Sequence, residues 1–202
     1  MPDTKQREPQ IAASLVNGIR RTLIEDGRWE QIEGEVLARA PALTDWLAFA
    51  ERAEWVSLDG HLTFLDALLG VLGRESLAAL GATRLKEDVD IGALARMLRA
   101  WLREFRSDAS ALLRVAPHAW QAATRNAGRM VVVDSTPGHM SFRVEGPPAV
   151  VLDRRGWHVF LEGFGSELLR QSGRQGSFSI EPDGGSLSLV ATWSEPGGSA
   201  LG

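Results

Sequence analysis

The spacing of apolar residues changes near residue 129, and this change constrains the fold more than any other feature of the sequence. Before it, apolar side chains recur every three or four residues, as Ile11, Leu15 and Ile19 do, which is typical of amphipathic helices. After it, apolar and polar side chains alternate, which is typical of half-buried strands. The chain therefore divides into a helical half, residues 8–126, and a strand-rich half, residues 129–193.

The strand-rich half predicts four strands and one helix. A turn composition, DSTPGH, joins two strand-like runs, and Met140, Phe142 and Val144 share one face of the second run. A helix with an apolar face is expected within 152–173, and a second hairpin turns at 183–185. The order β–β–α–β–β predicts an antiparallel sheet on which the N-terminal helical bundle packs, and therefore an α+β fold.

The helical half contains one segment, Leu62–Leu72, that is apolar on almost every side, as expected of a helix central to a core. We expect Gly70 and Gly73 to break this helix, and a following short helix to end at Gly81. A further amphipathic helix should begin after Asp90 and carry Leu98 and Trp101 on its apolar stripe.

The two halves are predicted to share one core, because the sequence shows neither an internal repeat nor a strong linker between them. The expected organisation is a single domain over residues 1–195. The last residues, 196–202, have a Gly- and Ser-rich composition that is typical of a disordered tail.

Composition excludes several classes of function. The chain has no cysteine, so thiol catalysis, iron–sulfur clusters and cysteine-bound zinc are impossible. The net charge is −4 and Lys5 and Lys86 are the only lysines, which argues against nucleic acid as a partner. The polar N-terminus lacks a signal-peptide core and no apolar run is long enough to span a membrane, so we expect a cytoplasmic protein.

Histidine His118 follows Pro117 at a predicted helix start and is the most conspicuous candidate ligand. A charged imidazolium there would oppose the helix dipole, and the alternative is a partly exposed first-turn residue. The other histidines, His61, His139 and His158, have no spacing that would place two on one helix face, so we predict neither a metal site nor a cofactor.

Arg125, which Asn126 follows in the sequence, is the best polar candidate for a ligand-binding residue. Its guanidinium could hold an anionic ligand in bidentate fashion. Alternatively, the two residues end the last helix and cap it before Gly128.

The C-terminal segments resemble a known superfamily. The resemblance rests on Trp120 to Gly128, Pro147-Pro148, Trp157 to Gly163 and Val190 to Trp193, segments of a layout that covers about half the chain. They resemble the 4-vinyl reductase-like and TRAPP-like superfamily, to which the haem–nitric-oxide-binding domains are related. More closely, they are similar to a family of proteins of about this length expanded in myxobacteria.

This resemblance implies a sensory or scaffold module, since superfamily members bind small ligands between helices and sheet or form dimers and larger complexes. Haem-binding members use a helical histidine and a Tyr-x-Ser-x-Arg motif. This chain has no tyrosine, so that motif is absent, and the cysteine-rich metal signature of some relatives is impossible.

Two hypotheses follow. The first is a non-enzymatic domain, in signalling for example, that binds an apolar small molecule, a protein partner or a second copy of itself in a groove between helices and sheet. The second is an enzyme with a site near Arg125, His139 and His158. For the first, the predicted ligand-binding residues are Phe64, Leu68, Leu98, Trp101, Trp120, Arg125 and Trp157.

Overall fold

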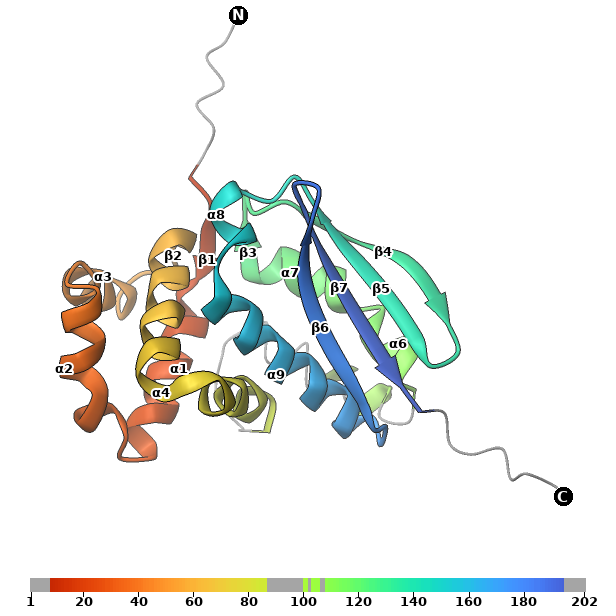
Figure 1. Ribbon diagram of the computed structural model, residues 1–202, viewed down its shortest axis with the longest axis horizontal. Helices are drawn as coiled ribbons and strands as arrows, with labels where there is room; N and C mark the ends of the chain where they lie inside the picture. Colours follow the sequence, from red (N-terminus) through yellow and green to blue (C-terminus); the bar gives the residue numbers. More distant parts are fainter. Residues whose placement is uncertain (1–7, 87–99, 102, 106–107, 195–202) are drawn as a thin grey trace, which may run out of the picture.

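The computed structural model describes residues 8–86, 100–101, 103–105 and 108–194 (Figure 1). Helices dominate its first half and a four-stranded antiparallel sheet lies in its second half, so the predicted α+β class is confirmed. The elements are β1 (Gln10–Ala12), α1 (Ala13–Glu25), α2 (Trp29–Arg39), α3 (Leu43–Ala50), β2 (Trp55–Ser57), α4 (Leu58–Lys86), α6 (Ala109–Leu113), α7 (Ala116–Ala123), β3 (Thr124–Arg125), β4 (Arg129–Thr136), β5 (His139–Glu145), α8 (Ala149–Leu152), α9 (Arg155–Gln171), β6 (Gly176–Asp183) and β7 (Ser186–Trp193).

The large sheet has the strand order β4-β5-β7-β6, and every neighbouring pair is antiparallel. The predicted alternation in β5 is confirmed, because Met140, Phe142 and Val144 are all buried. Gly184 and Gly185 both have positive φ, as a tight turn between β6 and β7 requires. Helix α9 packs on β6 and α7 packs on β4, and Figure 1 shows both helices beside the sheet.

A second, three-stranded sheet joins segments that are far apart in the sequence. Its order is β2-β1-β3, and Ile11 pairs with both Val56 and Thr124. This sheet was not predicted, and Ile11, which was expected in a helix, lies in β1. The strands have only two or three residues each, too few for an alternating pattern to be recognised.

Helix α4 differs from the prediction at its glycines. The chain bends at Gly73, where φ is 77°, but the helix runs through both Gly70 and Gly81. The predicted break at Gly70 and the predicted end at Gly81 are therefore wrong. Gly81 is a packing residue, since a Cβ there would overlap the carbonyl oxygen of Phe160 in α9.

Helices α4 and α9 approach each other through glycine at further positions. A Cβ on Gly163 would overlap the carbonyl oxygen of Ala78, and one on Gly156 would overlap the backbone of Leu65. Gly163 therefore faces α4 rather than the sheet. Gly165 does face the sheet, where a Cβ would overlap the ring of Phe178.

The end of the helical half also differs from the prediction. Helix α7 ends at Ala123, and Thr124 is already extended. Arg125 therefore belongs to β3, and the Asn126 amide donates to the Glu8 carbonyl rather than capping α7.

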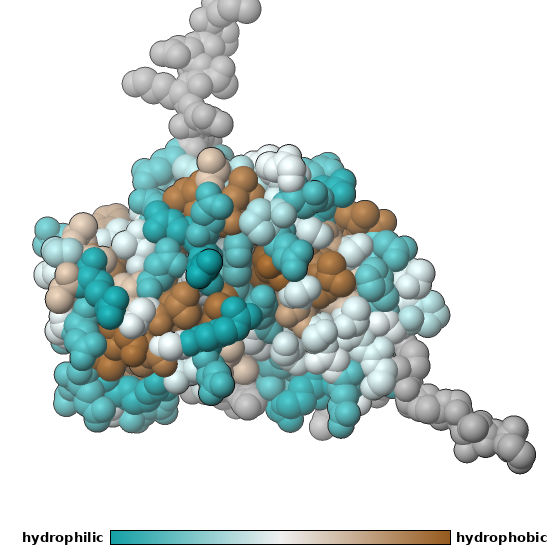
Figure 2. All heavy atoms as spheres, in the orientation of Figure 1, coloured by the Kyte–Doolittle hydropathy of each residue, from teal (hydrophilic) through white to brown (hydrophobic). Residues whose placement is uncertain are grey.

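Most large apolar side chains lie inside the molecule. Among the described residues, the large apolar side chains that stay well exposed are Ile24, Phe49, Val132 and Val133, on three separate elements. Figure 2 shows that polar side chains cover much of the visible face and separate its apolar patches. Within the described ranges, no helix is both long and apolar enough to cross a membrane.

Three predictions concern ranges that lie in whole or in part outside the described residues. They are the helix after Asp90, with Leu98 on its stripe, the tail 196–202, and the single domain over 1–195 as a whole. They stay predictions.

Candidate functional site

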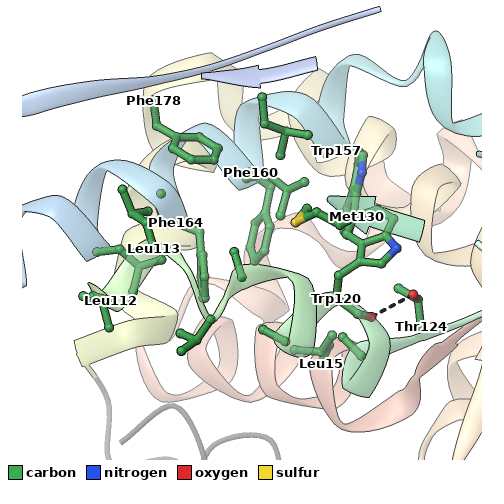
Figure 3. Close-up of a pocket in the computed structure, with 18 of the residues that line it drawn as sticks. Leu15, Leu112, Leu113, Trp120, Thr124, Met130, Trp157, Phe160, Phe164 and Phe178 are labelled. Carbon is green, nitrogen blue, oxygen red and sulfur yellow. Dashed lines mark hydrogen bonds between the residues drawn. The ribbon is translucent and has the colours of Figure 1, made fainter. Parts of the chain in front are cut away.

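An apolar pocket of about 160 Å³ lies where α7 and α9 meet the large sheet (Figure 3). We call it the α7–α9 pocket. Aromatic side chains converge on it from α9, α7 and β6. They are Trp157, Phe160, Phe164, Trp120 and Phe178. Smaller apolar side chains from α1, α6 and the sheet complete the wall.

Helical spacing explains why these side chains meet. In α9, Trp157, Phe160 and Phe164 are three and four residues apart, which places them on one face of the helix. In α7, Ala119 and Ala123 face the same pocket as Trp120. Because alanine ends at Cβ, that side of α7 leaves room opposite the aromatic rings of α9.

Two polar groups at the pocket already have hydrogen-bond partners. The Thr124 hydroxyl donates to the Trp120 carbonyl oxygen at 2.8 Å, as Figure 3 shows. The Trp120 indole N–H donates to the Gly128 carbonyl oxygen at 3.3 Å. Neither group has to turn into the pocket to be satisfied.

His61 and Trp157, by contrast, each have a buried ring nitrogen that lacks a partner in the described part of the chain. The His61 Nδ1 and the Trp157 Nε1 are buried, and neither has a hydrogen-bond partner among the described residues. The two rings pack edge to face, with centroids 5.4 Å apart. A buried polar group without a partner costs about 1–3 kcal/mol. Both groups would therefore be stabilised by a hydrogen-bond partner.

The imidazole of His61 is neutral in the folded protein. The residue is 1% exposed, and burial lowers its pKa from the ordinary value of 6.5 to about 3. Desolvation is the cause, because removing the charged imidazolium from water is unfavourable. His61 therefore presents one N–H donor and one acceptor nitrogen to its surroundings.

This pKa predicts a pH dependence of stability. Between pH 6.5 and about 3 the unfolded chain binds a proton at His61 that the folded chain does not bind, so the free energy of unfolding falls as the pH falls. In that pH range, His61 lowers the free energy of unfolding by at most about 1.4 kcal/mol for each pH unit. Urea titrations from pH 6 to 4 should show a steeper loss for the native chain than for His61→Leu. Equal slopes would contradict the neutral buried imidazole.

The predicted ligand residues separate into groups. Trp120 and Trp157 both line the α7–α9 pocket, with ring centroids 6.3 Å apart. Phe64 and Leu68 are fully buried in the core and do not line it. Leu98 lies outside the described residues.

Trp101 and Arg125, also predicted ligand residues, lie elsewhere. Trp101 is half-buried and packs edge to face against His118 at 6.4 Å, outside the pocket lining. The Arg125 guanidinium lies 3.8 Å from the centre of the Trp55 ring, a cation–π contact at the surface. Arg125 therefore neither borders the pocket nor caps α7.

The candidate histidines do not meet. His118 is exposed on α7, His139 lies 3.2 Å from the Asp134 carboxylate, and His158 lies 3.3 Å from the Val151 carbonyl oxygen. Across the described ranges, no three His, Asp or Glu side chains are arranged to hold a metal ion.

Sequence reasoning did not select His61 for the site. One signal was available, since Leu58, His61, Leu65 and Leu68 follow each other at three- and four-residue spacings in α4. A histidine on such an apolar face is expected to be buried. Nothing comparable in the sequence indicates that Phe178 lies at the pocket, because its position depends on how β6 packs over α9.

The fold is that of the H-NOX proteins. Two solved structures of an H-NOX protein from K. algicida, both Fe(II) unliganded and one an alanine-to-glycine variant, match with a TM-score of 0.60. They are 9% and 10% identical to this chain, and the matches cover 92% of it and 97–98% of those chains. A structure from work on haem distortion in the H-NOX family matches at 0.56, with 11% identity over 93% of this chain and 97% of the other.

Sequence comparison adds no relative. No family model matches the chain, and no curated protein matches it significantly. At about one residue in ten identical, the structural likeness shows the fold and nothing of the chemistry.

The residues around the α7–α9 pocket do not fit a haem. Pockets for drug-sized ligands measure roughly 300–1,000 Å³, whereas this one measures about 160 Å³. The described side chains that line it include no arginine or lysine, so two buried haem carboxylates would have no cation to pair with.

Proposed function

We propose that this chain is a non-enzymatic domain that binds a small apolar molecule in the α7–α9 pocket and acts as a sensor of that molecule. The observation that carries the proposal is the pocket itself. It is apolar and about 160 Å³ in volume, comparable to an engineered cavity of about 150 Å³ that binds benzene in another protein. The H-NOX fold supports the proposal by its architecture.

Sensing would follow from the position of the pocket. Its walls come from α1, α4, α6 and α7 in the helical half and from α9 and the sheet in the other half. A ligand held there contacts both halves at once, so binding adds contacts between them and stabilises the folded chain by mass action. Binding of a protein partner or of a second copy of the chain, which the sequence also suggested, stays a prediction.

The enzymatic alternative has weaker support. Arg125 precedes β4 and His139 follows it, and β4 is about 25 Å long. His158 borders a second, more polar pocket with Arg155 and Glu162, to which neither Arg125 nor His139 belongs. The three candidate residues therefore have separate surroundings.

Benzene binding tests the proposed function. We expect the native chain to bind benzene saturably at one site, measured by isothermal titration calorimetry. Ala119→Leu puts a larger side chain into the pocket and should weaken this binding at least tenfold, because the added atoms occupy the ligand's space.

Ala122→Leu is the matched control. Ala122 lies on the same helix but is exposed and does not line the pocket, so its substitution should leave benzene binding unchanged. Absence of saturable binding to the native chain, or equal weakening by both substitutions, would refute the proposal.

A further inference from the structure

A second pocket, of about 360 Å³, lies on the side of α9 that faces away from the α7–α9 pocket. Arg155 and Glu162 line it, and each comes two residues before a residue of the first pocket, Trp157 and Phe164. Two residues are about half a turn of an α-helix, so the two pairs point to opposite sides. Helix α9 packs against both α4 and β6, which supply the other walls (Figure 1). We call this space the α4–α9 pocket.

The α4–α9 pocket has an apolar part and a charged part. Its apolar side chains are Leu69, Val159 and Ile180. Its polar side chains are Arg74, Arg155, His158 and Glu162. Because Val159 and Ile180 are buried whereas both arginines are exposed, the apolar side chains form the inner part of the pocket and the guanidinium groups lie at its mouth.

Arg155 is the guanidinium that is left to bind a ligand. Arg74 pairs with Glu162, with 2.5 Å between Nη2 and Oε2. The preceding residue, Arg154, is held by the Asp66 carboxylate at 3.2 Å. Within the described part of the chain, no carboxylate pairs with the exposed Arg155 guanidinium. The two arginines and one glutamate of the pocket therefore leave one positive charge uncompensated.

These features define the ligand that the pocket suits. A guanidinium binds a carboxylate through two parallel N–H···O bonds, and such charge-assisted bonds are stronger than neutral ones. The single uncompensated charge matches a monoanion. The apolar inner part favours an organic ligand over an inorganic anion, which would lose its water there without gaining hydrogen bonds. The volume of about 360 Å³ is at the lower end of the range for ligand pockets, roughly 300–1,000 Å³.

We propose that the α4–α9 pocket binds a small organic monocarboxylate, with its carboxylate on Arg155 and its apolar end against Val159 and Ile180. His158 contributes a wall, since its Nε2 already lies 3.3 Å from the Val151 carbonyl oxygen. This site goes beyond the proposed function, which concerns the other side of α9 and an uncharged ligand.

Pentanoate is the probe for this site. In NMR titrations at pH 7, we expect it to shift the backbone amide signals of Val159 and Ile180 saturably. Pentanamide has the same size and no charge, so it should bind about tenfold more weakly or worse. Acetate keeps the charge but lacks most of the apolar chain, and its affinity should also be about tenfold lower or worse, because each buried methylene adds to binding.

Arg155→Gln removes the proposed anchor and should weaken pentanoate binding about tenfold or more. Its urea unfolding midpoint should match that of the native chain, because the Arg155 guanidinium has no carboxylate partner among the described residues. Arg21→Gln is the matched control. It makes the same change in charge at an exposed arginine of α1, outside the pocket, and should leave pentanoate affinity unchanged.

Three results would overturn the proposal. The first is that pentanoate causes no saturable shift at the pocket. The second is that pentanamide or acetate binds as tightly as pentanoate, which would remove the role of the charge or of the apolar inner part. The third is equal weakening by Arg155→Gln and Arg21→Gln, which would indicate nonspecific attraction to a positive surface. Benzene binding in the α7–α9 pocket is measured separately, so none of these results bears on the proposed function.

Discussion

Replacing Gly163 with alanine is expected to lower the free energy of unfolding by about 2–3 kcal/mol. Gly163 lies in α9 where that helix crosses α4, and an added Cβ would overlap the carbonyl oxygen of Ala78. The obstacle is backbone, so it cannot be relieved by the rotation of one side chain. The gain of about 0.5–1 kcal/mol that alanine brings to a helix offsets only part of this strain.

Gly34→Ala is the matched control for this substitution. Gly34 lies in α2, is exposed, and has nothing within 4 Å of an added Cβ. The same change there should leave stability unchanged or raise it by up to about 1 kcal/mol. Chemical denaturation of both variants measures the difference. A Gly163→Ala variant as stable as Gly34→Ala would mean that α4 and α9 are not in such close contact.

Replacing Phe64 with alanine should have the largest effect, a loss of about 3–5 kcal/mol in the free energy of unfolding. Phe64 is fully buried in α4. The centroid of its ring lies 6.1 Å from that of Trp29 and 6.4 Å from that of Trp46. The substitution would leave a cavity beside these two large rings. Phe49→Ala, at a phenylalanine that is 58% exposed, should change stability by less than about 0.5 kcal/mol.

The same residue tests the distinction between core and ligand site. The milder variant Phe64→Leu should bind benzene with the affinity of the native chain, because Phe64 does not line the α7–α9 pocket. A clear loss of benzene affinity in Phe64→Leu would show that the site extends into the core of the helical half. Calorimetry on the folded variant decides between the two.

Much of the fold could be predicted because the periodicity of this sequence is regular. Met140, Phe142 and Val144 alternate with polar residues, and the structure buries all three in the sheet. The short sheet could not be predicted in this way, since Ile11 pairs with Val56 and Thr124 across 45 and 113 residues of chain. Such pairing depends on how distant segments pack and leaves no local pattern.

Other wrong predictions concern glycines in helices. In a single sequence, a glycine that ends a helix and one that admits a neighbouring helix look alike. Gly81 was interpreted as a helix end, but its position opposite the Phe160 carbonyl shows that it allows α4 and α9 to approach. Gly73, by contrast, does bend α4, as its positive φ requires.

The site was predictable only in part, for a related reason. Periodicity shows that Trp120, Trp157, Phe64 and Leu68 face inward, but it does not show which neighbouring layer each one meets. The structure places the first two at the α7–α9 pocket and the other two in the core. His61 carries no motif, and its importance follows from burial without a hydrogen-bond partner, which only a structure shows.

The most direct test of the central claim is to locate a bound ligand. A crystal of the native chain soaked in bromobenzene should show an anomalous bromine peak inside the α7–α9 pocket, among Trp120, Phe160 and Phe178. The Ala119→Leu crystal should lose that peak and the Ala122→Leu crystal should keep it. A native crystal with bromine only at the surface, or none in the pocket, would contradict the account.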